Sequence, residues 1–220
     1  MNDRIILFFY VDDIIILHHP DYQEDFEKLE RQLIKLYNLR QMGDVKWFLG
    51  IRVERVLASR QLYLVQDAFI NKVCTEFDLI RSNGRYPSTP LSSTSRLLPY
   101  DRVSDPLLTK TYQRLIGNLA YIEIITRPDV AHAHSILARF LINPGPIHLS
   151  EIKHVWQYLY GTRYLAISAR GGEPTQTFAT KVNSSPPIFF SAADASFGDD
   201  EETRRLSAGY VFMLYGMPVN

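Results

Sequence analysis

Two short apolar runs near the start of the chain flank a pair of adjacent aspartates. The runs, Ile5–Phe9 and Ile14–Leu17, are rich in β-branched and aromatic residues and lack polar alternation. This pattern predicts two strands that are buried on both faces. The segment between them, Tyr10-Val11-Asp12-Asp13, predicts a hairpin turn that carries two carboxylates. We expect Asp12 and Asp13 near one exposed edge, because Asp is disfavoured inside strands.

Two adjacent carboxylates beside apolar strands repel each other and lose hydration, a cost that pairing or metal binding offsets. Mg2+ prefers oxygen ligands, and polymerases hold two metal ions at carboxylate edges for in-line displacement. An ordinary hairpin with Asp in its turn is the alternative, since turns favour this residue. The four residues by themselves leave both interpretations open.

The composition, with 46% hydrophobic and 22% charged residues among 220, is that of a soluble globular protein with one large or two small domains. The single cysteine, Cys74, excludes internal disulfides and cysteine-built zinc sites, and its apolar neighbours predict a small buried hydrophobe. The sequence has no apolar segment of membrane-spanning length and no signal-peptide pattern at its N-terminus. We therefore expect an intracellular protein, cytoplasmic or nuclear, with no membrane partner.

Charge is unevenly distributed although the net charge is zero. Residues 1–80 hold 10 Lys/Arg and 13 Asp/Glu, residues 81–170 hold 11 and 5, and residues 171–220 hold 3 and 6. An acidic, metal-binding end beside a basic middle suits a protein that moves a nucleic acid past a catalytic site. Solvated helix surfaces of mixed charge are the alternative explanation.

The pattern after the hairpin predicts a mixed α+β first part. A helix is expected from Pro20 to about Gln41, with Gly43 as its left-handed cap. Two strands follow, Val45–Val56 and Gln61–Gln66, and then a helix from Asp67 to Phe77.

Residues 81–107 are rich in Ser, Pro and Thr and include Asn83-Gly84, which predicts a linker or a long surface excursion and the best domain boundary. Later segments have helical or strand character. The expected helices are Tyr112–Ile125, Asp129–Leu141 and His148–Tyr160, and the expected strands are Tyr164–Ser168, Ile188–Ala192 and Ser207–Tyr215. The last two strands predict a small mixed sheet with a turn over Asp199–Arg205.

Seven short segments in a fixed order resemble a known family. They are Tyr10-Val11-Asp12-Asp13, Met42–Ile51, Leu64-Val65-Gln66 with Phe69-Ile70, Tyr112–Leu119, Thr126–Ala131, Tyr158–Thr162, and Ala193–Phe197 with Thr203-Arg204-Arg205 and Ser207–Tyr210. In this order they resemble the Pol polyprotein of copia-type LTR retrotransposons, from reverse transcriptase into ribonuclease H. The resemblance covers nearly the whole chain.

The resemblance implies four regions. Residues 1–80 would be a partial reverse transcriptase palm, with its hairpin and helix, and the start of the thumb. Residues 81–107 would be a linker or thumb excursion, and residues 108–170 a helical connection-like region. Residues 171–220 would be the N-terminal portion of a ribonuclease H-like domain, with an incomplete sheet.

The resemblance also implies residue roles in a reaction that uses an RNA template, a DNA primer and an RNA–DNA hybrid. Asp12 would bind catalytic Mg2+, with Asp13 supporting the site from beside it. Tyr10 would pack under the primer terminus. A grip on the primer backbone would be formed by Trp47, Phe48, Leu49 and Gly50. Plain strand packing is the alternative for these four, because Trp and Phe favour strands in any case.

Asp194 resembles the first metal-binding carboxylate of a ribonuclease H site, although Ala192-Ala193 precede it where the family usually has Ser or Asp. A loop or strand-end Asp is the alternative. We expect the acidic run Asp199–Glu202 to be a solvated turn. The pairs His18-His19 and His132/His134 are expected in surface or packing roles.

The family's polymerase site needs another aspartate on a strand far before the hairpin, and its ribonuclease H site needs carboxylates beyond the second strand. The sequence therefore predicts that both sites are incomplete in this chain. The leading hypothesis is a fragment of an RNA-directed DNA polymerase that is inactive alone. A non-catalytic nucleic-acid-binding remnant and a poorly folded chain without function are the alternatives.

Overall fold

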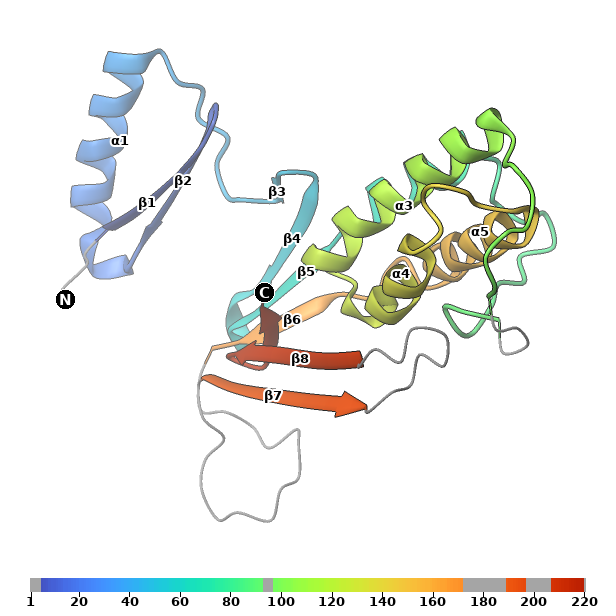
Figure 1. The fold of residues 1–220 in the computed structure, drawn as a ribbon. Helices are drawn as coiled ribbons and strands as arrows, with labels where there is room; N and C mark the ends of the chain where they lie inside the picture. Colours follow the sequence, from blue (N-terminus) through green and yellow to red (C-terminus); the bar gives the residue numbers. More distant parts are fainter. Residues whose placement is uncertain (1–4, 93–96, 172–188, 197–206, 220) are drawn as a thin grey trace, which may run out of the picture. The chain divides into compact units, whose positions relative to one another are not determined.

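The computed structural model describes residues 5–92, 97–171, 189–196 and 207–219. These residues form the mixture of helices and antiparallel sheets that defines an α+β chain (Figure 1). The chain divides into two compact units, residues 1–46 and residues 47–220. Among the described helices, none combines the length and apolar character that a membrane span requires.

The first unit contains the predicted hairpin and one helix. Strands β1 (Ile5–Tyr10) and β2 (Asp13–His18) pair antiparallel, from Ile5 opposite His18 to Tyr10 opposite Asp13. A short 3-10 turn, η1 (Pro20–Tyr22), leads into helix α1 (Gln23–Tyr37). The predicted hairpin is confirmed, residue for residue at its first strand.

Two expectations for this unit are wrong. Helix α1 ends at Tyr37 rather than near Gln41, because Asn38 adopts the left-handed conformation (φ 50°) and caps the helix in place of Gly43. The hairpin strands are also not buried on both faces, since Ile6 is 51% and Leu17 is 54% exposed.

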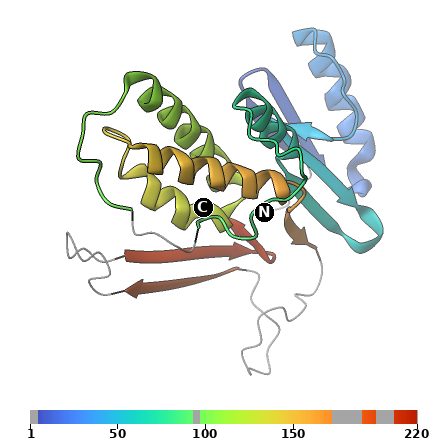
Figure 2. The same ribbon diagram turned by 90° about the vertical axis from the view of Figure 1, so that its right-hand side faces the viewer.

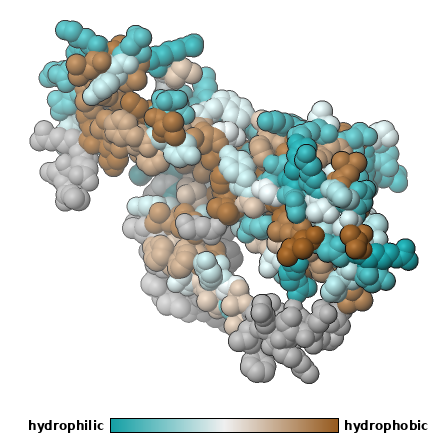
Figure 3. Space-filling model, turned by 45° about the horizontal axis from the view of Figure 1, so that its top comes forward, coloured by the Kyte–Doolittle hydropathy of each residue, from teal (hydrophilic) through white to brown (hydrophobic). Residues whose placement is uncertain are grey.

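A single helix covers one face of a two-stranded hairpin. His18 of β2 stacks on Phe26 of α1 with 4.3 Å between ring centroids. Ile6 and Leu17 are cross-strand partners and project from the same face of the hairpin. Figure 3 shows hydrophobic residues reaching the surface of this unit at its upper left.

The second unit begins with a four-stranded antiparallel sheet. Its strands, in spatial order, are β3 (Trp47–Phe48), β4 (Ile51–Val56), β5 (Gln61–Val65) and β6 (Ile167–Arg170). The single strand predicted over Val45–Val56 is wrong. Leu49 and Gly50 both have positive φ, 50° and 75°, and this two-residue turn folds the segment into a hairpin.

Four helices and a 3-10 turn pack around the main core. They are α2 (Asp67–Glu76), α3 (Pro106–Ile125), η3 (Pro128–Val130), α4 (Ala131–Ala138) and α5 (Pro146–Gly161). The predicted helices are confirmed, with shifted ends. Helix α3 begins at Pro106 rather than Tyr112, because the Asp105 side chain accepts the Leu107 N–H (3.0 Å) and proline suits the first helical position.

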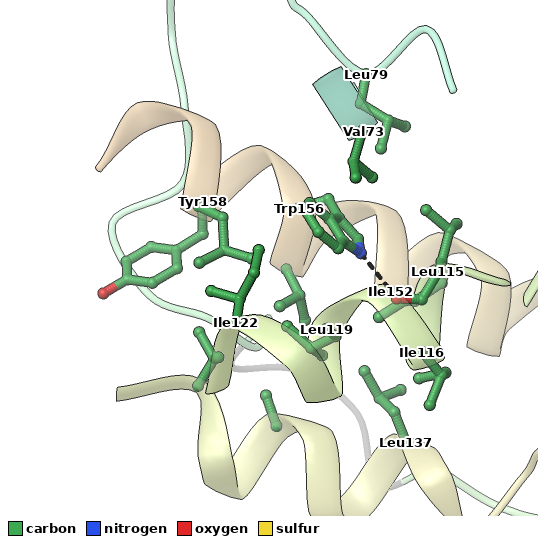
Figure 4. Packing of buried hydrophobic residues seen from close by; sticks show 14 of the residues in the cluster. Val73, Leu79, Leu115, Ile116, Leu119, Ile122, Leu137, Ile152, Trp156 and Tyr158 are labelled. Atoms are coloured by element: carbon green, nitrogen blue, oxygen red, sulfur yellow. Dashed lines mark hydrogen bonds between the residues drawn. The ribbon is translucent and has the colours of Figure 1, made fainter. Parts of the chain in front are cut away.

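The core of the second unit is built by α2, α3, α4 and α5 around Trp156 (Figure 4). The Trp156 indole is fully buried and its Nε1–H donates to the Leu115 carbonyl at 3.2 Å. Cys74 is fully buried as predicted, and burial raises the pKa of its thiol to about 12. The thiol is therefore a packing group, not a reactive one.

The segment between α2 and α3 packs along α5, and we name its described parts, residues 81–92 and 97–105, the strap. The Ser92 hydroxyl donates to Glu151 Oε1 at 2.6 Å, and His154 Nε2 donates to the Thr89 carbonyl at 3.1 Å. Tyrosines cover both ends of α5. Tyr100 lies over Gly145 and Tyr86 over Gly161, so close that an added Cβ would lie 2.5 Å and 2.6 Å from tyrosine carbons.

Three strands form the last sheet, all antiparallel. They are β7 (Phe189–Ser196), β8 (Ser207–Leu214) and β9 (Met217–Val219). Two of them match predicted strands, whereas β9 was not expected and the described sheet is not mixed. The predicted turn over Asp199–Arg205 lies outside the described residues. The Arg170 N–H donates to the Tyr215 carbonyl at 3.3 Å, which joins β6 to the β8–β9 turn.

The close approach of Tyr86 to Gly161 predicts that alanine destabilises the fold at Gly161 but not at an open glycine position. We expect Gly161→Ala to lower the free energy of unfolding by roughly 1–3 kcal/mol, because the new Cβ overlaps the Tyr86 Cβ. Gly117→Ala on α3 is the matched control. That position is exposed with nothing within 4 Å of an added Cβ, so alanine should stabilise by about 0.5–1 kcal/mol. Urea titration followed by Trp156 fluorescence measures both, and equal effects would contradict the packing.

The buried imidazole of His148 predicts a pH dependence of stability. Its Nδ1 accepts the Gly145 N–H at 2.8 Å, so Nε2 carries the proton and donates to the Leu98 carbonyl at 3.0 Å. Burial lowers the pKa of His148 in spite of the Leu98 bond, so the unfolded chain binds a proton more readily. The stability is present above the unfolded pKa of about 6.5 and is lost as the pH falls below it.

We therefore expect the free energy of unfolding to decrease from pH 7.5 to pH 5.5, with a flatter slope in His148→Gln. The exposed His132 supplies the control, His132→Gln, whose slope should match the wild type. A His148→Gln slope equal to that of the wild type would rule out this histidine as the source.

Candidate active site

The tip of the β1–β2 hairpin presents both candidate carboxylates to solvent. Val11 and Asp12 form the two-residue turn, and Asp13 is the first residue of β2, opposite Tyr10. Directly opposed residues of an antiparallel pair project from the same face, so Tyr10 and Asp13 share one face of the hairpin. The expected placement of Asp12 and Asp13 near the turn and exposed is confirmed, except that Asp13 belongs to the strand.

The residue before Asp12 has an unusual backbone. Val11 lies in the left-handed region with φ 48°, which is rare for a β-branched side chain, and it is 88% exposed. A conformation of this kind costs on the order of 1–3 kcal/mol and occurs preferentially at functional sites. The hairpin therefore holds a strained backbone next to its first carboxylate.

Carboxylate oxygens that are open to solvent are the donors that hard divalent cations prefer. Within the described ranges, no group of three or more His, Cys, Asp or Glu residues is arranged to hold a metal ion. The histidines in these ranges have other contacts: His18 stacks on Phe26, and His134 Nδ1 lies 2.7 Å from Glu123 Oε2. Asp12 and Asp13 are therefore two exposed carboxylates that belong to no larger group of this kind in the described ranges.

The candidate grip, Trp47 to Gly50, is the β3–β4 hairpin of the second unit. Trp47 is 53% exposed, and Phe48 is half-buried. The hydroxyl of Tyr121 on α3 donates to the Leu49 carbonyl at 2.7 Å, and its ring meets Phe69 edge to face at 4.9 Å. The structure brings the four grip residues together on one turn and anchors that turn to α3.

Asp194 lies on β7, opposite Gly209 of β8, and is exposed. Its Oδ1 accepts the N–H of Ala195 at 2.9 Å. Asp194 is therefore an exposed strand residue, because β7 continues past Ala192, where the predicted strand ended. The acidic run Asp199–Glu202 lies outside the described residues.

Residues 126–131 and 158–162 join in one ion-pair network around the buried Arg127 and the partly exposed Asp129. Arg127 is 1% exposed and donates from Nε and Nη2 to the two Asp129 oxygens at 2.8 Å and 2.7 Å. Its guanidinium also donates to the Thr162 hydroxyl and carbonyl, while the Tyr158 hydroxyl donates to Asp129 at 2.8 Å. The sequence offered one signal for this network: Arg127 lies two residues before Asp129, and an arginine needs a partner when it is buried.

Burial raises the pKa of Asp129, but the Arg127 guanidinium and the Tyr158 hydroxyl outweigh it, so this pKa lies below its ordinary value. The pKa of Tyr158 is raised by burial and by the adjacent Asp129. Asp129 is therefore a permanently charged structural group, and these residues form no part of the candidate active site.

Comparison with known proteins shows what the chain is similar to. Residues 1–92 match the family model described as reverse transcriptase (RNA-dependent DNA polymerase). Three relatives match over nearly the whole chain. The retrovirus-related Pol polyprotein from transposon TNT 1-94 of Nicotiana tabacum is 31% identical over 98% of this chain and 15% of its own length. The putative transposon Ty5-1 protein of Saccharomyces cerevisiae is 29% identical over 96% of this chain and 62% of its own length. The retrovirus-related Pol polyprotein from transposon RE1 of Arabidopsis thaliana is 25% identical over 98% of this chain and 13% of its own length. No solved structure matches significantly.

Residues 1–92 are thus similar to the reverse transcriptase family. Over nearly its full length, the chain is similar to one region of retrotransposon Pol polyproteins. It spans less than two thirds of the length of each of these relatives.

The Tyr121–Leu49 hydrogen bond predicts a selective effect on the grip turn. We expect Tyr121→Phe to lower the free energy of unfolding by about 0.5–1.5 kcal/mol and to speed amide exchange at Gly50 and Ile51, because the Leu49 carbonyl loses its donor. Tyr63→Phe in β5 is the control, since its hydroxyl has no hydrogen-bond partner among the residues described. Unchanged exchange in Tyr121→Phe would refute the anchoring role.

Proposed function

We propose that the chain is a portion of a copia-type retrotransposon RNA-directed DNA polymerase that carries the metal-binding hairpin. The observation that carries this proposal is the exposed Asp12–Asp13 pair at the hairpin tip, within the segment that matches the reverse transcriptase family. Asp12 is the proposed metal ligand, and Asp13, fixed by its pairing with Tyr10, supports it. The substrates would be an RNA template and a DNA primer.

The donor chemistry fits Mg2+, which binds one or two carboxylates and takes its remaining ligands from water and substrate phosphates. When bound, Mg2+ supplies charge neutralisation on the triphosphate and a lower pKa for the attacking hydroxyl. The residues of the chain itself would position the primer. Tyr10 would contact the primer terminus from the face it shares with Asp13, and the β3–β4 turn, Trp47–Gly50, would contact the primer backbone.

Asp194 is the corresponding proposal for ribonuclease H-like chemistry on an RNA–DNA hybrid. It is exposed on β7, and no group of three or more His, Cys, Asp or Glu residues in the described ranges includes it. We propose that it binds divalent metal weakly and cleaves nothing unaided.

The metal proposal is tested with Mn2+, which broadens NMR signals near its binding site. We expect Mn2+ to broaden the amide signals of Val11–Asp13 first, and the effect to disappear in Asp12→Asn. Asp44→Asn is the matched control, because Asp44 is an exposed carboxylate of the same unit that lies apart from the tip in the sequence. Broadening at the tip that persists in both variants would contradict the assignment.

The same 220 residues should incorporate no nucleotide on a primed RNA template with Mg2+ or Mn2+, since two carboxylates supply too few ligands for two metals. Template-dependent incorporation that Asp12→Asn abolishes would overturn the proposed inactivity and leave the metal assignment intact.

A second candidate function is nucleic-acid binding without catalysis. It is favoured by Arg81, Arg85 and Arg163 of the second unit, which have no carboxylate partner among the described residues. It does not depend on the carboxylate hairpin.

A further inference from the structure

Arginines and tyrosines gather where the strap begins and α5 ends. We name this group the arginine–tyrosine cluster, and its members are Arg81, Arg85, Tyr86, Tyr160, Arg163 and Tyr164. The strap is fixed to α5 there by a hydrogen bond from Arg81 to the Gln157 side chain and by the Tyr86 ring over Gly161. Figure 2 shows the chain after α2 passing this end of α5.

The centre of the cluster is a guanidinium that contacts two aromatic rings. The Arg163 Cζ atom lies 4.4 Å from the ring centroid of Tyr160 and 4.6 Å from that of Tyr164. The Tyr86 ring lies 5.1 Å from the Tyr160 ring and is tilted against it by 45°. Aromatic rings beside an arginine form a surface on which a nucleobase can stack.

The cluster carries positive charge that the described residues do not neutralise. Some arginines of the second unit have carboxylate partners: Arg52 pairs with Asp67, and Arg114 with Glu76. Arg81, Arg85 and Arg163 form no ion pair within the described ranges, and the Arg163 Nε, although buried, has no hydrogen-bond partner there.

Fold stability accounts for some members of the cluster and not for others. Arg81, Tyr86 and Tyr160 hold the strap on α5. Tyr164 is 65% exposed, and the hydrogen bonds of Arg85 within the described chain use its backbone. An exposed aromatic ring beside an unpaired arginine side chain stabilises little and is suited to contact a ligand.

We propose that the arginine–tyrosine cluster binds single-stranded nucleic acid, with Tyr164 stacking on a base and Arg81, Arg85 and Arg163 contacting phosphates. A single strand fits better than a duplex, because stacking on a side chain needs a base that is free of its neighbours. The inference rests on the proposed nucleic-acid-binding function and assigns that function a location on the second unit.

The test measures fluorescence anisotropy of a labelled 15-nucleotide oligouridylate with the full chain at several salt concentrations. A 15-base-pair RNA–DNA hybrid serves as the duplex probe. We expect the wild type to bind the single strand more tightly than the hybrid by at least fivefold. Affinity should fall with salt, because bound cations are released from the phosphates.

The variants separate stacking from charge. Tyr164→Ala should weaken single-strand binding roughly 5- to 100-fold with little change in the salt slope. Arg85→Gln should reduce the slope of log affinity against log salt by about 0.7, the value for one phosphate contact on a single strand. The matched controls are Tyr37→Ala on α1 and Lys110→Gln near the start of α3, both exposed, and both should bind as wild type. Circular dichroism melts confirm that each variant is folded.

The outcomes are distinct. Absence of binding to either probe overturns the nucleic-acid-binding function together with this inference. Binding that is unaffected by Tyr164→Ala and Arg85→Gln, or affected equally by Lys110→Gln, overturns the assigned surface alone. Hybrid binding as tight as single-strand binding overturns the stacking mode. Metal broadening at the β1–β2 tip is independent of all three results.

Discussion

The ion pair between the buried Arg127 and the partly exposed Asp129 is the constraint around which the second unit is arranged. A guanidinium that is 1% exposed is tolerated only when it is hydrogen-bonded, because loss of its partners would leave an uncompensated buried charge. Asp129 takes two of the arginine's hydrogen bonds, and Thr162 takes the others. The pair therefore joins the turn after α3 to the end of α5, two segments that are distant in sequence.

This connection fixes the position of the residues that follow α5. Thr162 is held on both its carbonyl and its hydroxyl by Arg127, and Arg163 follows it directly. The backbone from which Arg163 and Tyr164 project is thereby fixed from inside the core. On the outer side, Tyr86 of the strap packs against Gly161, where there is no side chain in the way. A surface held from both sides is preorganised, which lowers the entropy lost when a ligand binds.

The local sequence pattern was sufficient to predict those helices and strands that have a strong hydrophobic periodicity. The β1–β2 hairpin follows from two apolar runs around a turn, and α2 to α5 follow from helical spacing with Pro and Gly at their ends. The turn at Leu49-Gly50 was missed because leucine seldom adopts a positive φ. Asn38 could cap α1 in place of Gly43 because asparagine, like glycine, adopts the left-handed conformation.

The packing of the strap could not be predicted in this way. Its Ser, Pro and Gly content indicates irregular backbone correctly, but its contacts with α5 join residues about 60 positions apart, as in Ser92 with Glu151. The same holds for the Tyr121–Leu49 hydrogen bond. Sequence pattern located the candidate carboxylates Asp12 and Asp194, because exposed strand and turn positions are local properties. It could not supply the partners that hold the grip turn.

The candidate functional residues consequently fall into two physical groups. Asp12 and Asp194 are exposed and make few side-chain contacts in the described chain, so their replacement by Asn should change metal chemistry while altering stability by less than about 0.5 kcal/mol. Leu49 and Arg163 are held through Tyr121 and Tyr160, so changes to those tyrosines affect fold and ligand contact together. The proposed chemistry depends on exposed residues, and the geometry depends on buried ones. Substitutions at the hairpin tip should therefore alter the proposed function without altering folding, whereas substitutions in the helical core should alter both.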